Sequence, residues 1–193
     1  MDILAICGSP RKNKTTHNML KAILDGAGRT HEIVWPAYLK IGHCLGCLNC
    51  KKVTPGKCVQ DDDMSWVIEK MFAAKALIIV SPTYFGNVPG PLKNLIDRSI
   101  PTCYSGKGDA WMGAENHGTR PFKGLPAVMA VASGGADHEK TAANLRLVLE
   151  YYEYSIIGEY FEGMGGVIVT QEDYPDIYQE LFDLGKKLDM ALG

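Results

Sequence analysis

A loop rich in hydroxyl and basic side chains follows the first apolar run of the chain. The run Ile3–Ile6 stops at Gly8, and a helical pattern begins after Thr16. The amides of such a loop and the positive end of the helix dipole point at one spot, which favours a bound phosphate. The side chains that add hydroxyl donors or positive charge are Ser9, Thr15, Thr16, Arg11 and Lys14. The sequence therefore predicts a phosphate-bearing ligand beside the first strand.

This loop matches neither of two common phosphate-binding patterns. It lacks Gly-x-x-x-x-Gly-Lys-Ser/Thr and Gly-x-Gly-x-x-Gly. Hydroxyls and one arginine suit the terminal phosphate of a mononucleotide. The alternative is an ordinary polar turn in which Thr15 or Thr16 caps the following helix.

A second loop, Ser81–Pro91, follows the apolar run Leu77–Val80. Its aromatic residues can form a wall for a planar ring, and the next residues can present backbone amides to ring carbonyls and nitrogens. These residues are Pro82, Thr83, Tyr84, Phe85, Gly86 and Asn87. Pro91 suits the start of a helix, where no amide hydrogen is needed. The alternative is a proline-rich turn whose aromatic residues cover the end of the sheet.

A third loop of this kind follows the run Ala127–Ser133. Gly134 and Gly135 permit a close approach of the backbone to a ligand. Asp137 can cap the helix expected to begin near Glu139. Since ligands of open parallel sheets bind beyond the carboxyl ends of the strands, we expect the three loops to face one crevice.

Four of the six cysteines lie between Cys44 and Cys58. Cys44, Cys47 and Cys50 are separated by two residues each, and Cys58 follows after seven. In a reducing compartment such crowding indicates metal binding or redox chemistry rather than structural disulfides. Cys7 lies within a strand and is expected in the core, and nothing assigns a role to Cys103.

Strand and helix patterns alternate along the chain. The expected strands are Ile3–Cys7, Glu32–Trp35, Ala76–Ser81, Ala127–Ser133 and Ile156–Phe161. The expected helices are Thr16–Gly26, Asp61–Ala74, Pro91–Ser99, Glu139–Tyr154 and Pro175–Leu192. This alternation predicts an α/β fold, a doubly wound five-stranded parallel sheet with helices on both faces. The acidic residues 61–63 are interpreted as a helix start.

Two connections are longer than a minimal version of this fold requires. They are a cysteine-rich loop at 36–60 and a long loop at 100–124. Long loops in compact domains are usually functional or disordered. His17 follows the hydroxyl-rich loop and His43 precedes Cys44. Either could approach a flavin or a cluster, but both are interpreted as hydrogen-bonded surface groups.

The 193 residues and the formal net charge of -2 favour one domain over residues 1–193 and provide no basic surface for nucleic acid or an anionic membrane. The first apolar run is too short for a signal-peptide core, so a cytoplasmic location is expected.

The combination of motifs resembles one known family. The residues concerned are Gly8–Asn13 with Thr15 and Thr16, Ser81–Pro89 with Leu92, Lys93, Asp97 and Arg98, and the four clustered cysteines with Asp62–Met64. They resemble the NADPH-dependent FMN reductase-like branch of the flavodoxin-like superfamily, and within it the iron–sulfur flavoproteins. The resemblance spans residues 1 to about 165 and implies the strand order 2-1-3-4-5.

The resemblance implies an FMN cofactor. Its phosphate would be held by Ser9, Arg11, Asn13, Thr15 and Thr16. Its ring would lie against Pro82–Asn87, with further contacts from Ser133, Gly134 and Gly135. It also implies a homodimer or homotetramer with the flavin near a subunit interface. Many relatives carry glycine where this chain has Lys14.

For the cysteines, the spacing and the resemblance favour a [4Fe–4S] cluster held by Cys44, Cys47, Cys50 and Cys58. Two alternatives stay open at this point. A four-cysteine zinc site more often uses two separated Cys-x-x-Cys pairs, and relatives can keep such a loop with free or redox-active thiols.

The expected function is that of an FMN-dependent oxidoreductase. Electrons would pass from NAD(P)H or a ferredoxin-like donor through FMN to an acceptor, with the cluster taking part. The alternatives are an NAD(P)H-dependent flavin or quinone reductase without a cluster, a non-enzymatic flavodoxin-like electron carrier and a cysteine redox sensor. No side chain is assigned as a catalytic acid or base.

Overall fold

The computed structural model describes residues 1–110, 118–135, 137–163 and 169–193. Its strands are β1 (Ile3–Cys7), β2 (His31–Val34), β3 (Ala76–Pro82), β4 (Asp109–Ala110), β5 (Thr119–Arg120), β6 (Pro126–Ser133) and β7 (Ser155–Gly163). Its α-helices are α1 (Thr15–Ala27), α2 (Asn49–Lys52), α3 (Met64–Ala73), α4 (Gly90–Arg98), α5 (His138–Tyr151) and α6 (Pro175–Leu192). Two short 3-10 helices are η1 (Pro36–Tyr38) and η2 (Ile100–Tyr104).

Five strands form one parallel sheet in the order β2-β1-β3-β6-β7. β4 and β5 pair with each other in a separate antiparallel ribbon. The central sheet therefore has the expected 2-1-3-4-5 arrangement, and the doubly wound α/β fold is confirmed. The strand order reverses between β1 and β3, which is where ligands bind in such sheets.

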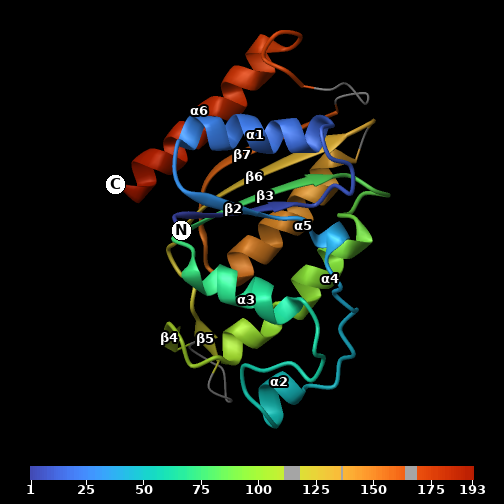
Figure 1. The fold of residues 1–193 in the computed structure, drawn as a ribbon, viewed down its shortest axis with the longest axis vertical. Coiled ribbons are helices and arrows are strands. Elements are labelled where there is room, and N and C mark those ends of the chain that lie inside the picture. The colour runs from blue at the N-terminus through green and yellow to red at the C-terminus, as the bar shows by residue number, and fades with distance from the viewer. Residues whose placement is uncertain (111–117, 136, 164–168) are drawn as a thin grey trace.

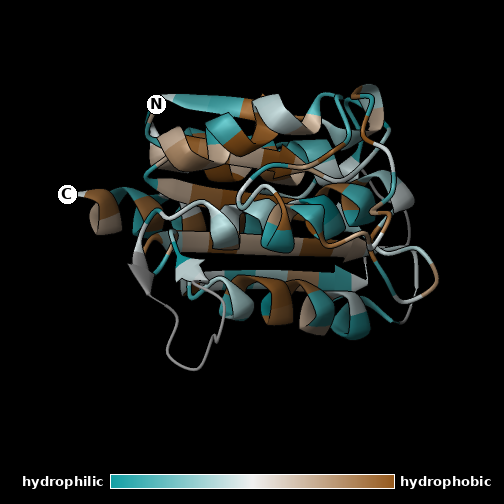
Figure 2. Ribbon diagram, turned by 90° about the horizontal axis from the view of Figure 1, so that it is seen from below, coloured by the Kyte–Doolittle hydropathy of each residue, from teal (hydrophilic) through white to brown (hydrophobic). Residues whose placement is uncertain are grey.

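Alternate residues of each central strand face opposite layers of helices. Ile3, Ala5 and Cys7 pack with α1 and α6, whereas Leu4 and Ile6 pack with α3, α4 and α5. Figure 1 shows these two helical layers on either side of the sheet, and Figure 2 shows hydrophobic strands between helices of mixed polarity. Both faces of the strands are buried, which explains their continuous apolar runs. None of the described helices is long and apolar enough to cross a membrane.

The two long loops contain little regular structure. Residues 36–60 hold only η1 and the one-turn α2, and residues 100–124 hold η2, β4 and β5. Residues 111–117 of the second loop, Trp111 among them, lie outside the described residues. Helix α3 begins at Met64 rather than at Asp61 as expected, and α1 begins at Thr15, one residue early.

Helices α1 and α6 cross where each carries a glycine. A Cβ atom at Gly26 would lie 1.9 Å from the carbonyl oxygen of Phe182, and one at Gly185 would lie 2.0 Å from that of Ile23. Only glycine allows the two backbones to approach this closely. This contact lets the two helices cover one face of the sheet together.

We expect Gly185→Ala to lower the free energy of unfolding by about 1 to 3 kcal/mol, because the added methyl overpacks the helix crossing. Urea unfolding of the purified protein measures this change. Gly90→Ala is the matched control, since Gly90 is also helical but a Cβ there would meet no heavy atom within 4 Å. Equal stability of the two variants would contradict the interpretation.

Candidate functional site

The carboxyl ends of three neighbouring strands bring the three predicted loops together. Cys7 of β1 pairs with Val80 of β3, and Pro82 of β3 pairs with Ala132 of β6. The amide of Gly8 donates to the carbonyl of Val80 at 2.7 Å. The loops after β1, β3 and β6 therefore leave the sheet at the same edge (Figure 1).

A pocket of about 100 Å³ lies between these loops. It is lined by Arg11, Thr15, Thr16, Pro82, Thr83, Tyr84, Ala132, Ser133 and Gly134. All three loops contribute to it, and all of its lining residues except Ala132 are predicted ligand-binding residues. Ala132 lies within the predicted strand, and its place at the strand end is the signal that could have included it.

One polar side chain of this pocket has an unsatisfied hydroxyl. The Thr83 hydroxyl oxygen is buried and has no hydrogen-bond partner among the described residues. Lys14, the residue before α1, makes no side-chain cap hydrogen bond, and no acidic residue occupies the first turn of α1. The N-cap position is therefore held by Lys14 and not by Thr15 or Thr16. The positive end of the helix dipole is left for an anion.

The close packing under the pocket requires glycine at position 8. A Cβ atom at Gly8 would lie 2.6 Å from Cδ2 of Leu92 and 3.2 Å from Oγ of Ser81. The chain can therefore turn tightly out of β1 only without a side chain here. This turn brings the hydroxyl-rich loop back over the end of β3.

Ser9 and Asn13 shape the first loop and do not line the pocket. The buried Ser9 Oγ accepts a hydrogen bond from the amide of Arg11 at 3.1 Å. Asn13 has a φ of 55°, in the left-handed region, and its amide donates to Nδ1 of His17 at 2.9 Å. Burial, and then Lys21 and Lys12, lower the pKa of His17. The lowered pKa favours the neutral ring, whose Nδ1 can accept this bond.

Two aromatic residues support this loop from outside, and sequence reasoning missed both. Trp35 packs edge-on against His17, with 5.0 Å between ring centroids. The hydroxyl of Tyr38 donates to the carbonyl of Pro10 at 2.7 Å, and the Lys12 ammonium lies 4.7 Å from the Tyr38 ring centroid. Their position directly after β2, a neighbour of β1, is the signal that could have identified them.

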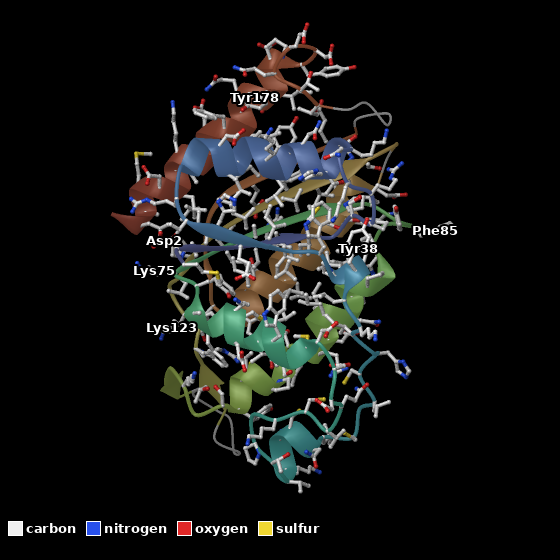
Figure 3. All side chains as sticks on the ribbon, in the orientation of Figure 1. Asp2, Tyr38, Lys75, Phe85, Lys123 and Tyr178 are labelled. Atoms are coloured by element: carbon white, nitrogen blue, oxygen red, sulfur yellow. The ribbon has the colours of Figure 1, made fainter. Side chains whose placement is uncertain are left out.

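The second loop closes in a tight turn. Tyr84 and Asn87 exchange backbone hydrogen bonds of 2.8 and 3.0 Å, and the two residues between them have positive φ angles. Phe85 is fully exposed and extends outward (Figure 3). Gly86 packs beside Lys140, and Oδ1 of Asn87 accepts from an adjacent amide. Phe85, Gly86 and Asn87 therefore do not line the pocket.

The third loop leaves open space at its glycines. A Cβ atom on Gly134 or Gly135 would meet no described heavy atom within 4 Å. Gly135 does not line the pocket, and its amide donates to the Ser133 hydroxyl at 3.1 Å. Asp137 occupies the N-cap position of α5 as expected, but without the side-chain hydrogen bond of a cap. Its carboxylate pairs with Lys140 at 2.6 Å.

The four clustered cysteines are free thiols. Cys44 and Cys47 are exposed, whereas Cys50 and Cys58 are half-buried. No group of three or more His, Cys, Asp or Glu residues in the described ranges is arranged to hold a metal ion. Burial raises the pKa of the Cys50 thiol, and the thiols of Cys58, Cys44 and Cys47 raise it further. Their donor chemistry fits a cluster, but the structure does not draw them together around one.

A buried ion pair anchors the cysteine segment. Both terminal nitrogens of Arg98 donate to the Asp62 carboxylate at 2.9 Å, and Nη1 also donates to the carbonyl of Gly42 at 3.0 Å. Asp62 accepts from the amides of Gly42 and Met64 at 3.1 and 3.2 Å. Asp62 therefore lies at the start of α3, in line with the interpretation of residues 61–63 as a helix start. It also fixes the position of the chain before Cys44.

Sequence reasoning missed this pair. Leu92, Leu95 and Arg98 follow one another at intervals of three, and all three are buried on α4. An arginine at the next position of an apolar helical stripe is the signal of a buried cation. Such a cation needs a carboxylate partner.

The two candidate sites lie in different parts of the molecule. Figure 1 places α2 below α3 and α4, away from the sheet, whereas the pocket lies at the ends of the strands. A second pocket of about 420 Å³ lies beside the cysteine segment, and Cys58, Met64 and Arg98 are among its lining residues.

The family model for NADPH-dependent FMN reductases matches residues 1–164. An iron–sulfur flavoprotein from Archaeoglobus fulgidus is 46% identical over 102 residues, which are 51% of this chain and 49% of that protein. One from Methanosarcina thermophila is 38% identical over 103 residues, 52% of this chain and 53% of that protein. The chain thus spans about half the length of these relatives. A second A. fulgidus iron–sulfur flavoprotein is 30% identical over 99% of this chain and 80% of its own length.

Solved structures show the same fold at low identity. An FMN-dependent NADH-azoreductase from Bacillus anthracis in complex with FMN has a TM-score of 0.65 at 16% identity, over 98% of this chain and all of its own. A flavodoxin from the domain Archaea has a TM-score of 0.60 at 12% identity, over 100% of this chain and 99% of its own. Both support the flavodoxin-like fold.

We expect Asp62→Asn to destabilise the protein by about 3 kcal/mol at pH 7, because it leaves the buried Arg98 charge without its partner. Urea unfolding measures the loss. Asp97→Asn is the matched control, since Asp97 pairs with Lys93 on an exposed helix face, where such pairs contribute less than about 1 kcal/mol.

The effect of Asp62→Asn depends on pH. Burial alone would raise the pKa of Asp62, but hydrogen bonds from Arg98, Gly42 and Met64 outweigh it and hold the pKa below its ordinary value. The stabilisation is therefore complete above the unfolded-state pKa of about 4 and is lost as the pH falls through the lower folded-state pKa. A difference from wild type that stays constant down to pH 2 would contradict this assignment.

Proposed function

Because the chain belongs to the NADPH-dependent FMN reductase family, we propose that it is an oxidoreductase that binds FMN and takes electrons from NAD(P)H. The observation that carries this proposal is the pocket at the strand ends. It combines the N-terminal end of α1, hydroxyl groups and one arginine on one side with Tyr84 on the other. A phosphorylated planar cofactor needs this combination.

Arg11, Thr15 and Thr16 bind the FMN phosphate in this proposal. They line the pocket, and the first turn of α1 adds amide donors and a positive dipole end. Ser9 and Asn13 act indirectly, since their hydrogen bonds to neighbouring residues hold the loop in shape.

Pro82, Thr83 and Tyr84 contact the ring, together with Ser133 and Gly134 on the facing loop. The unpartnered Thr83 hydroxyl supplies a hydrogen bond for a polar atom of the cofactor. FMN, when bound, accepts two electrons as hydride and can release them singly. The protein's part is to orient the ring and to exclude competing contacts, and it needs no acid or base.

We further propose that Cys44, Cys47, Cys50 and Cys58 hold a [4Fe–4S] cluster. Three observations support this: the spacing of the cysteines, the mutual influence of their thiols and the names of the relatives. A cluster would accept single electrons from the flavin and deliver them to a ferredoxin-like or small-molecule partner. A homodimer or homotetramer of a single-domain chain is part of the same proposal.

A flavin or quinone reductase without a cluster is the second candidate. The exposure of Cys44 and Cys47 favours it, because the four thiols are not gathered around a centre among the described residues. The two candidates share the FMN pocket and differ only in iron content and in the use of the cysteines.

We expect the protein to bind FMN more tightly than riboflavin, and Arg11→Gln to weaken FMN binding by about 10- to 100-fold, the value of a charge-assisted hydrogen bond. Riboflavin affinity should not change, because riboflavin has no phosphate. Fluorescence titration measures both. Arg29→Gln, which removes an arginine paired with Asp189 at the other end of α1, is the control. Equal losses for both flavins would disprove the phosphate assignment.

An anaerobic absorption spectrum with iron and sulfide assays tests the cluster. We expect about four irons per chain in the wild type after reconstitution, as in a [4Fe–4S] centre. Cys47→Ser should lose most of the iron and retain FMN, whereas Cys103→Ala should keep both, since Cys103 is buried elsewhere. NADPH oxidation by an iron-free wild type would establish the second candidate, and full iron in Cys47→Ser would refute the ligand assignment.

A further inference from the structure

Arg98 occupies an unusual place for a charged residue. It is 2% exposed at the last turn of α4, and it is among the largest fully buried side chains of the protein. Its two terminal nitrogens are satisfied by Asp62 and by the carbonyl of Gly42. These contacts involve only the two terminal nitrogens of the guanidinium group, Nη1 and Nη2.

The Nε atom of Arg98 has no hydrogen-bond partner in the part of the chain that the structure describes. An unpaired buried N–H donor is costly, so in a native protein it calls for an acceptor or a functional role. Cys58 and Arg98 line the same pocket of about 420 Å³, which places the Cys58 thiol on the same side of the molecule as the guanidinium group. Burial lowers the pKa of Arg98, but the hydrogen bonds to Asp62 and the nearby Cys58 outweigh it and raise the pKa.

Arg98 and its neighbours also hold both ends of the cysteine segment. Before Cys44, the carbonyl of Ile41 accepts from Nδ2 of Asn94 at 3.2 Å, and that of His43 accepts from Nε2 of Gln60 at 3.1 Å. After Cys58, the chain runs through Gln60 to the buried pair of Asp62 and Arg98. The two ends of the segment are thus bound to the same end of α4.

We propose that Arg98 is a positioning residue of the cysteine site, whose free Nε–H donates to the sulfur of Cys58 when that sulfur binds iron. The inference rests on the proposed cluster. A bound thiolate is a strong acceptor, whereas the free thiol is a weak one, which explains why Nε is unpartnered with free thiols. Hydrogen bonds to cluster sulfur raise the reduction potential, and groups that orient metal ligands strengthen metal binding.

The test compares Arg98→Lys with wild type after anaerobic reconstitution. Lysine keeps the charge and can pair with Asp62, but it cannot serve Asp62, Gly42 and Cys58 at once. We expect a lower cluster potential in a spectroelectrochemical titration and about 10- to 100-fold weaker retention of iron against a chelator. The flavin potential, read in the same titration, should not move.

Arg146→Lys is the matched control, because Arg146 forms a comparable two-bonded pair with Glu159 away from the cysteines. If Arg98→Lys and Arg146→Lys both keep the wild-type potential and iron retention, the inference is overturned while the proposed cluster stands. If wild type binds FMN but no iron, the proposed cluster fails and the inference falls with it.

A measurement on wild type covers the case in which Arg98→Lys does not fold. Pulsed electron paramagnetic resonance of the reduced protein, labelled with nitrogen-15 arginine, detects an arginine nitrogen coupled to the cluster. We expect such a coupling, because Arg98 is the buried arginine beside Cys58. An iron-loaded protein without this coupling would overturn the inference.

Discussion

The ion pair between Asp62 and Arg98 holds together parts of the chain that no secondary structure joins. Residues 39–43, directly before Cys44, belong to neither a helix nor a strand, so their backbone groups need other partners. Side chains from α4 and from Gln60, in the segment before α3, provide them at Ile41, Gly42 and His43. A buried pair of charges adds little net stability because both ions must be desolvated. Its consequence here is geometric, since it fixes where the cysteine segment leaves and rejoins the fold.

The pocket at the strand ends depends on a different constraint, the register of a parallel sheet. The ends of β1, β3 and β6 are adjacent only because these strands are neighbours in the sheet. Gly8 lets the first loop fold closely over β3, and the shape of that loop comes from hydrogen bonds of Ser9 and Asn13. The residues proposed to bind the phosphate are therefore positioned by Gly8, Ser9 and Asn13, which do not line the pocket.

Helix α4 connects the two candidate sites. It begins directly after the loop that contains Tyr84 and ends at Arg98 beside Cys58. Nine residues of α-helix span about 13 Å. One rigid element therefore relates the proposed flavin ring to the proposed cluster, and its apolar face anchors both to the core through Leu92 and Leu95.

The sequence by itself determined the alternation of strands and helices, the strand-end loops and the grouping of the cysteines, because these follow from local periodicity and from residue types at short spacing. Its errors were also local, as at Asp137, which holds the N-cap position of α5 without the side-chain hydrogen bond of a cap. Only the tertiary structure decided which loop residues line the pocket, since Phe85 turns outward while Thr83 turns in. It alone revealed the pairing of Asp62 with Arg98, 36 residues apart. Such a contact depends on how α3 and α4 pack on the sheet, and no short-range pattern records that packing.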